Sequence, residues 1–183
     1  MTACDTYVAL LRGVNVGGKH ILPMKELSAM ASDCKCRGVR TYIQSGNVVF
    51  AASPEIARQL PLVLAKKIQE GFGFASPVIV RTRDELAKVV RANPFAKQGL
   101  PEKELHVHFL AELPTAKAVK ALDPNRSAPD AFRVIGREVY LHMPNGMGRT
   151  KLTSVYLDAR LATVGTARNW TTVQKLLAMM EGS

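Results

Sequence analysis

Hydrophobic and polar positions follow strand-like and helix-like periods in short blocks along this 183-residue chain. Residues 7–11 form an apolar run, and residues 39–52 alternate apolar with polar side chains around a Ser-Gly-Asn turn. Helical spacing follows Pro23 and again follows Ser53, and residues 77–81 form another short apolar run. The order strand, helix, strand, strand, helix, strand predicts a ferredoxin-like split βαβ arrangement over residues 1–82.

The second helical block contains a proline. Pro61 falls on the same stretch as Leu60 and Leu64, and a proline inside a helix costs about 3 kcal/mol. We therefore expect a kink at Pro61, or a short turn followed by a helix that begins near Leu60.

Thr82 and Glu85, at the boundary of the second half of the chain, 83–183, have the spacing of a capping box. This box starts a helix that Pro94 ends. The further expected elements are a strand at 105–111, a helix at 114–122, a hairpin at 132–143, a helix through Leu161, a short apolar segment around Val164 and a closing helix with Trp170. The sequence thus predicts an α+β protein with two subdomains, 1–82 and 83–183. The second has βαββα order, each has an antiparallel sheet, and no repeat of residues indicates a duplication.

Composition is typical of a soluble globular protein, with 47% hydrophobic and 22% charged residues. No apolar run reaches the roughly 18 to 20 residues of a membrane span, and no secretory signal is recognisable. Cys4, Cys34 and Cys36 do not make a disulfide framework. These features predict a cytoplasmic protein without a membrane partner. The net charge of +10 favours anionic partners, either nucleic acid or a phosphorylated small molecule.

Two glycine-rich basic loops are candidate anion sites. The first follows the first strand and offers cations, an amide and glycine backbone, namely Arg12, Asn15, Gly17, Gly18 and Lys19. It matches neither a Walker A motif nor a dinucleotide fingerprint, so a loop that needs glycine only for its turns is the alternative. The second, at 145–151, offers Gly148, Arg149 and Lys151, with Thr150 as the expected cap of the next helix. Two cations at the positive end of a helix dipole are unfavourable unless an anion is nearby.

Residues 166–170 form a third basic segment. Arg168 adjoins an expected helix cap and is a candidate fifth contact, whereas Trp170 is expected in the core.

Several of these blocks resemble one protein family. The stretches YVALLRGVNVGGKHILPMKEL, RTYIQSGNVVF, NPF, NGMGRTKL and TARNWTTVQKL are similar to the successive conserved blocks of an uncharacterised bacterial family, domain of unknown function 1697. The family usually has serine before Lys151, where this chain has Thr150, which keeps a hydroxyl group. The resemblance implies an α+β fold with a ferredoxin-like part and implies no established activity.

A metal site is a weaker alternative. His106 and His108 lie two apart on an expected strand and share one face, and His142 could lie on a neighbouring strand. Solvent-facing histidines are the simpler interpretation, and no spacing fixes a third ligand. We therefore predict no stoichiometric zinc and no cofactor.

Neither base-specific RNA recognition nor nucleophilic catalysis has support. Aromatic residues make up 6% of the chain, and the RNA-recognition octapeptide is absent. Ser45 has no histidine or acid at a diagnostic spacing, so no catalytic residue is predicted. The sequence favours a protein that binds a phosphate-bearing ligand, a small molecule or a nucleic-acid backbone, through its basic loops. An enzyme acting on a phosphorylated small molecule is the alternative.

Overall fold

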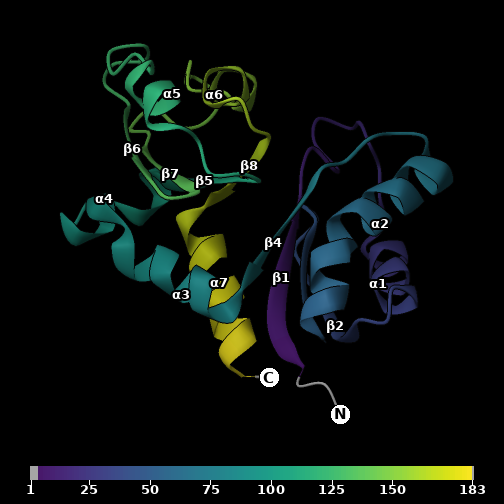
Figure 1. Ribbon diagram of the computed structural model, residues 1–183. Helices are drawn as coiled ribbons and strands as arrows, with labels where there is room; N and C mark the ends of the chain where they lie inside the picture. The colour runs from purple at the N-terminus through teal and green to yellow at the C-terminus, as the bar shows by residue number, and fades with distance from the viewer. Residues whose placement is uncertain (1–3, 183) are drawn as a thin grey trace. The chain divides into compact units, whose positions relative to one another are not determined.

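The computed structural model describes residues 4–182, which divide into two compact units (Figure 1). The first unit comprises residues up to Ala87 together with residues from Lys175 onward, and the second spans Lys88–Gln174. The sequence placed its boundary after residue 82 and assigned the whole C-terminal segment to the second subdomain. In the structure, Arg40 Nη2 donates a hydrogen bond to the carbonyl oxygen of Met179, 2.5 Å away, which ties the end of the last helix to the first unit.

The first unit has the predicted order of elements around an antiparallel sheet. These are β1 (Asp5–Leu11), α1 (Met24–Asp33), β2 (Arg37–Tyr42), β3 (Asn47–Ala52), α2 (Pro54–Phe72) and β4 (Val78–Thr82). The strands lie in the order β2-β3-β1-β4, and each neighbouring pair is antiparallel. The ferredoxin-like prediction is confirmed for this half.

One face of this sheet forms the main core because its side chains meet both helices. Tyr7, Ala9 and Leu11 of β1 pack with Leu27 of α1 and Leu64 of α2, all nearly inaccessible to solvent. The helical spacing of Leu60, Leu64 and Ile68 directs one stripe of α2 onto the sheet, which fixes the position of the loops at the strand ends.

Helix α2 runs without interruption through Pro61. The expectation of a separate turn before Leu60 is therefore wrong. Ser53 caps the helix by accepting a hydrogen bond from the amide of Ile56, and the buried stripe continues on both sides of the proline. This packing outweighs the hydrogen bond that Pro61 cannot donate.

The second unit contains a sheet of the same topology. Its elements, with the two helices that also have residues in the first unit, are α3 (Arg83–Ala92), α4 (Pro94–Lys97), η1 (Glu102–Glu104), β5 (Leu105–Leu110), α5 (Ala116–Lys120), β6 (Ala131–Ile135), β7 (Glu138–His142), α6 (Ser154–Leu161), β8 (Gly165–Asn169) and α7 (Trp170–Glu181). The order β6-β7-β5-β8 repeats β2-β3-β1-β4. The segment around Val164 leads into a strand, so both halves of this α+β protein carry an antiparallel four-stranded sheet.

Equivalent backbone hydrogen bonds lie at the ends of two central strands, β1 and β5. The amide of Leu11 donates to the carbonyl of Gly46, and the amide of Leu110 donates to that of Arg137, each over 2.8 Å. The next amide along each strand bonds the residue before the last strand, Pro77 in one half and Val164 in the other. The two halves therefore share a topology and equivalent backbone hydrogen bonds although their sequences do not repeat.

No helix within residues 4–182 is long and apolar enough to cross a membrane.

Candidate functional site

The first glycine-rich loop is held together by the side chain of Asn15. Its amide nitrogen donates to the carbonyl oxygens of Leu22 (2.9 Å) and Gln44 (2.7 Å), and its amide oxygen accepts from the Leu22 amide (2.8 Å). Asn15 also has a φ of +55°, a conformation that asparagine tolerates better than most residues. The structure thus gives Asn15 a role inside the loop.

The tip of this loop is a tight turn. Lys19 donates its amide to the carbonyl of Val16 over 3.0 Å, and Gly17 and Gly18 between them both have positive φ. Lys19 is exposed, whereas Arg12 is half-buried at the strand end, where its carbonyl accepts from Ser76 Oγ. Arg12 and Lys19 therefore differ in their access to a ligand.

The second glycine-rich loop enters its helix later than the sequence predicted. Helix α6 begins at Ser154, and Thr153 is its cap, accepting a hydrogen bond from the amide of Tyr156. The prediction of Thr150 as the cap is wrong. Thr150 Oγ1 instead accepts from the amide of Leu152 two residues on, a local turn that competes with capping.

A turn at residues 123–130 supports this loop. Ser127 Oγ accepts from the amide of Lys151 (2.9 Å) and donates to Asp130 Oδ2 (2.7 Å). Arg126 Nε donates to the carbonyl of Lys151 over 3.2 Å. Two segments about 25 residues apart in sequence are therefore joined, and Arg126 is brought to the loop that carries Arg149 and Lys151.

Two arginines, Arg126 and Arg160, lie over the ring of Tyr156 in α6. The guanidinium carbon of Arg126 lies 4.0 Å from the centre of the Tyr156 ring, and that of Arg160 lies 5.7 Å from it. Sequence reasoning missed both arginines and Tyr156. The i, i+4 spacing of Tyr156 and Arg160 on a helix was a usable signal, but nothing in the sequence linked either to Arg126.

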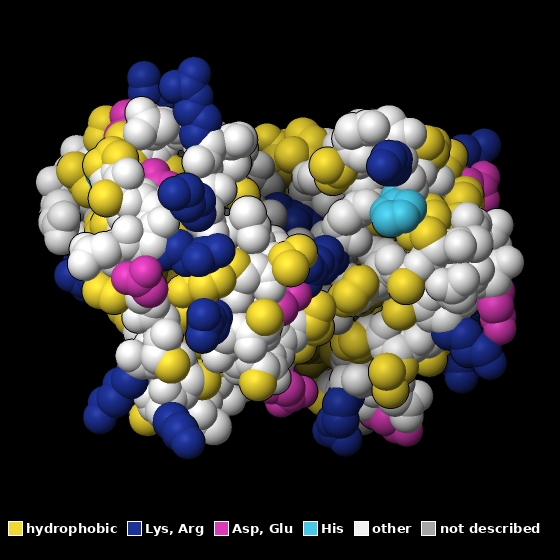
Figure 2. All heavy atoms as spheres, turned by 90° about the horizontal axis from the view of Figure 1, so that it is seen from above, with side chains coloured by type: hydrophobic (Ala, Val, Ile, Leu, Met, Phe, Trp, Pro, Cys, Tyr) yellow, Lys and Arg dark blue, Asp and Glu magenta, His cyan; other side chains and the backbone are white. Residues whose placement is uncertain are grey.

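We call Arg126, Arg149, Lys151 and Arg160 the basic cluster. All four are exposed, and among residues 4–182 none of them forms an ion pair with a carboxylate. In Figure 2, dark blue Lys and Arg side chains predominate over magenta acidic ones on the part of the second unit turned to the viewer. The cluster is therefore a surface of unbalanced positive charge.

The neighbouring carboxylates have other hydrogen-bond partners. Asp123 accepts from the amide of Asn125, Asp130 from the hydroxyl of Ser127, and Asp158 from the amide of Gly165. These hydrogen bonds hold turns and a strand end in place, so the three carboxylates have a structural role. None of these acids forms an ion pair with a cation of the cluster in the described part of the chain.

Arg168, the predicted fifth contact, lies in the interior. It is 7% exposed, and its Nη1 donates to Thr166 Oγ1 and to the carbonyl of Ala167, both over 2.8 Å. Burial lowers the pKa of its guanidinium to about 10. This placement leaves Arg168 out of the basic cluster. The helix cap beside it is Asn169, whose Oδ1 accepts from the Thr172 amide, and Trp170 is buried as expected.

The histidines of β5 are buried, so the expectation that they face solvent is wrong. His106 is 9% and His108 1% exposed, and burial lowers the pKa of His106, against a hydrogen bond with the Glu104 backbone. His142 lies opposite Leu105 in the sheet, so its side chain emerges from the other face, where it bonds Glu104 over 3.0 Å. The three histidines therefore do not converge.

The described part of the chain contains no cluster of side chains that could bind a metal ion. No group of three or more His, Cys, Asp or Glu side chains in residues 4–182 is placed to hold an ion. Cys34 and Cys36 do not add one, and burial raises the pKa of Cys36 to about 11, against metal-binding thiolate formation.

Comparison with known proteins gives a family and a fold. Among solved structures, the chain is similar to the conserved bacterial protein SP0830 from Streptococcus pneumoniae, with a TM-score of 0.69 and 21% identity over 97% of this chain and 99% of that one. No curated protein matches. The model of a family described as a protein of unknown function, DUF1697, matches residues 4–140, a range that ends before the loop at 145–153. The chain belongs to the DUF1697 family.

Proposed function

We propose that this protein binds a phosphate-bearing ligand at the basic cluster, with the cytoplasm as its compartment. The observation that carries the proposal is the placement of Arg126 and Arg160 over one tyrosine ring, beside a loop with two more cations. Like charges gathered without a carboxylate partner repel one another. A phosphate group would relieve this repulsion and accept charge-assisted hydrogen bonds from the guanidinium groups.

Two hydroxyl groups in the supporting turns favour ligand binding at the same loop. Ser127 and Thr150 have their side-chain oxygens 3.5 Å apart, and both also bond the backbone of the loop. They hold the loop in one conformation before a ligand arrives. Preorganisation of this kind lowers the entropy that binding must overcome.

The first loop forms a separate candidate surface on the other unit. Arg12 and Lys19 supply two cations there, and Gly17 and Gly18 supply turn amides. The basic cluster has the additional support of the Tyr156 ring. Within the proposal the surface of the first loop ranks second.

Calorimetric titration with inorganic pyrophosphate at low salt tests the proposal. Arg126→Ala and Arg149→Ala should each weaken binding about tenfold or more, because a charge-assisted hydrogen bond contributes about 1.5 to 3 kcal/mol. Lys97→Ala, an exposed cation on α4, is the matched control and should bind as the native chain does.

Arg12→Ala and Lys19→Ala in the same titration examine the first loop. If pyrophosphate does not bind, or binds Arg126→Ala and Arg149→Ala as it binds the native chain, the proposal of a site at the basic cluster is wrong. Phosphate release from nucleotides and sugar phosphates, followed in parallel, separates a binding protein from an enzyme, because only an enzyme forms product.

A further inference from the structure

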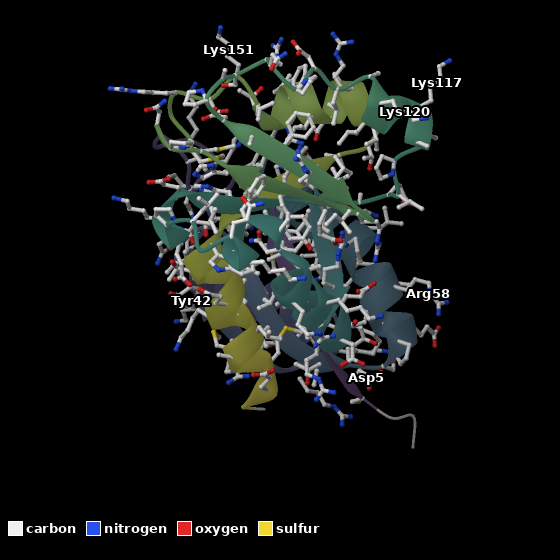
Figure 3. All side chains as sticks on the ribbon, turned by 90° about the vertical axis from the view of Figure 1, so that its left-hand side faces the viewer. Asp5, Tyr42, Arg58, Lys117, Lys120 and Lys151 are labelled. Atoms are coloured by element: carbon white, nitrogen blue, oxygen red, sulfur yellow. The ribbon has the colours of Figure 1, made fainter. Side chains whose placement is uncertain are left out.

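The cations of the second unit extend beyond the basic cluster onto α5. Lys117 and Lys120 lie three residues apart on this helix, both exposed, and in Figure 3 they project from the same end of the unit as Lys151. Helices α5 and α6 contact each other, and Val119 packs against the core that holds Leu157 and Leu161. The two lysines thus lie at the same end of the unit as Lys151, on a helix that contacts the one carrying Arg160.

Resting on the proposed phosphate site, we propose that this surface binds the sugar-phosphate backbone of a nucleic acid without sequence preference. Six cations take part: Lys117, Lys120, Arg126, Arg149, Lys151 and Arg160. One phosphate group offers three or four oxygens and cannot engage cations that extend over two helices and two loops. A chain of phosphates can.

The aromatic ring of Tyr156 in this surface already has guanidinium partners. Tyr156 already carries the guanidinium of Arg126 at 4.0 Å and that of Arg160 at 5.7 Å, and its hydroxyl accepts from the Asp123 amide. The Arg126 guanidinium therefore competes with a base for this ring, and stacking is what usually adds affinity for single strands. Binding should come from phosphate contacts and fall steeply with salt.

The apolar residues of the same helices argue against a lipid surface. A helix that lies on a membrane needs an exposed apolar face. Leu157 and Leu161 of α6 are buried in the core, and on α5 Val119 packs against that core. Of the large apolar side chains on these two helices, Val155 is the one that is mostly exposed, at 73%. A single exposed valine does not make the continuous apolar face that a membrane-surface helix needs.

Fluorescence anisotropy with labelled mixed-sequence oligonucleotides of roughly 16 nucleotides measures this binding across about 50 to 200 mM salt. With six phosphates engaged, the logarithm of the affinity should fall with the logarithm of salt concentration at a slope of about −4 for single strands. Oligonucleotides of different sequence should bind equally.

The double variant Lys117→Gln/Lys120→Gln should reduce the steepness of this slope by about 1 to 1.5 and weaken low-salt binding several-fold. Pyrophosphate binding should stay unchanged in this variant, since both lysines lie outside the basic cluster. The control Lys97→Gln/Lys103→Gln removes the same charge from exposed positions on α4 and η1 and should leave the slope as in the native chain.

The outcomes separate this inference from the phosphate site itself. If pyrophosphate binds through Arg126 but oligonucleotides show a shallow slope, or the control pair loses as much as the lysine pair, the phosphate site stands and the nucleic-acid inference is overturned. Tighter binding to phosphatidylglycerol vesicles than to oligonucleotides at equal salt would also overturn it. If neither pyrophosphate nor oligonucleotides bind, both proposals fail.

Discussion

Arg81 and Arg168 occupy the same position in the two sheets. Each is the fourth residue of the last strand, opposite Val8 in one sheet and Val107 in the other, and each donates its Nη1 to the carbonyl of the preceding residue. Both are almost completely buried. A guanidinium is therefore buried at equivalent points of the two sheets, which is a structural use of positive charge in a basic protein.

The first prediction concerns the buried guanidinium of the second unit. Arg168→Met keeps much of the side-chain volume but leaves Thr166 Oγ1 and the Ala167 carbonyl without this donor, so unfolding free energy should fall by about 1 to 3 kcal/mol. Arg133→Met is the matched control, because Arg133 makes the same bond to its preceding carbonyl but is exposed. It should change stability by less than about 0.5 kcal/mol in urea denaturation. Equal losses in the two variants would contradict the prediction.

The second prediction follows from the close approach of β8 to His108. A Cβ added at Gly165 would overlap the imidazole ring and lie 2.8 Å from the Phe109 carbonyl oxygen. Gly165→Ala should lower the unfolding free energy by about 1 to 3 kcal/mol because neither neighbour can move freely. Gly148→Ala meets no atom within 4 Å, and thermal unfolding should show it close to the native chain. A native-like melting temperature for Gly165→Ala would show that the strand can shift.

The third prediction separates structure from binding in the first loop. Asn15→Gly retains the freedom to adopt positive φ but removes three hydrogen bonds, and each is worth about 0.5 to 1.5 kcal/mol. Its melting temperature should fall, whereas that of Lys19→Ala should not. The melting temperature of Asn15→Ala should fall further, since alanine disfavours positive φ. If Asn15→Gly melts as the native chain does, the amide is not what holds this loop.

The fourth prediction is a pH dependence that originates at His106. Its pKa is lowered by burial, so between the folded and unfolded pKa values the unfolded chain binds the proton and the native one does not. Stability should therefore be lost as the pH falls below about 6.5, by at most about 1.4 kcal/mol per pH unit. His106→Leu should show a smaller loss between neutral and mildly acidic pH in urea titrations. Parallel pH profiles for both proteins would contradict it.

Local chemistry was predictable where two nearby residues decide it. Thr82 and Glu85 form the expected capping box, with the Thr82 amide donating to Glu85 Oε2 and the Glu85 amide donating to Thr82 Oγ1. The helix after Thr150 was placed too early because two threonines three apart could each cap it, and the sequence could not show that Ser127 supports Thr150 in a different turn.

The sequence was enough to predict the loop of the candidate site, but not the full set of residues that form it. Arg149 and Lys151 followed from a glycine-rich segment, but Arg126 joins them through a contact between distant turns. The burial of His106 and His108 was missed for a related reason. Period-two spacing shows that two side chains share a face and leaves open whether helices cover it.

The irregular pairing of β2 affects how readily this strand could pair with another copy of the chain. β2 is an edge strand, and its register with β3 shifts between Arg37 and Arg40. An edge strand exposes backbone groups that a second chain can pair with, and a bulge flanked by charged side chains disrupts such a template. The two exposed arginines would also repel the same edge of another copy. We expect this irregularity to protect against fibrous aggregation. A variant with a regular β2 and without Arg37 and Arg40 should form β-sheet-rich precipitates at concentrations where the native chain stays dispersed.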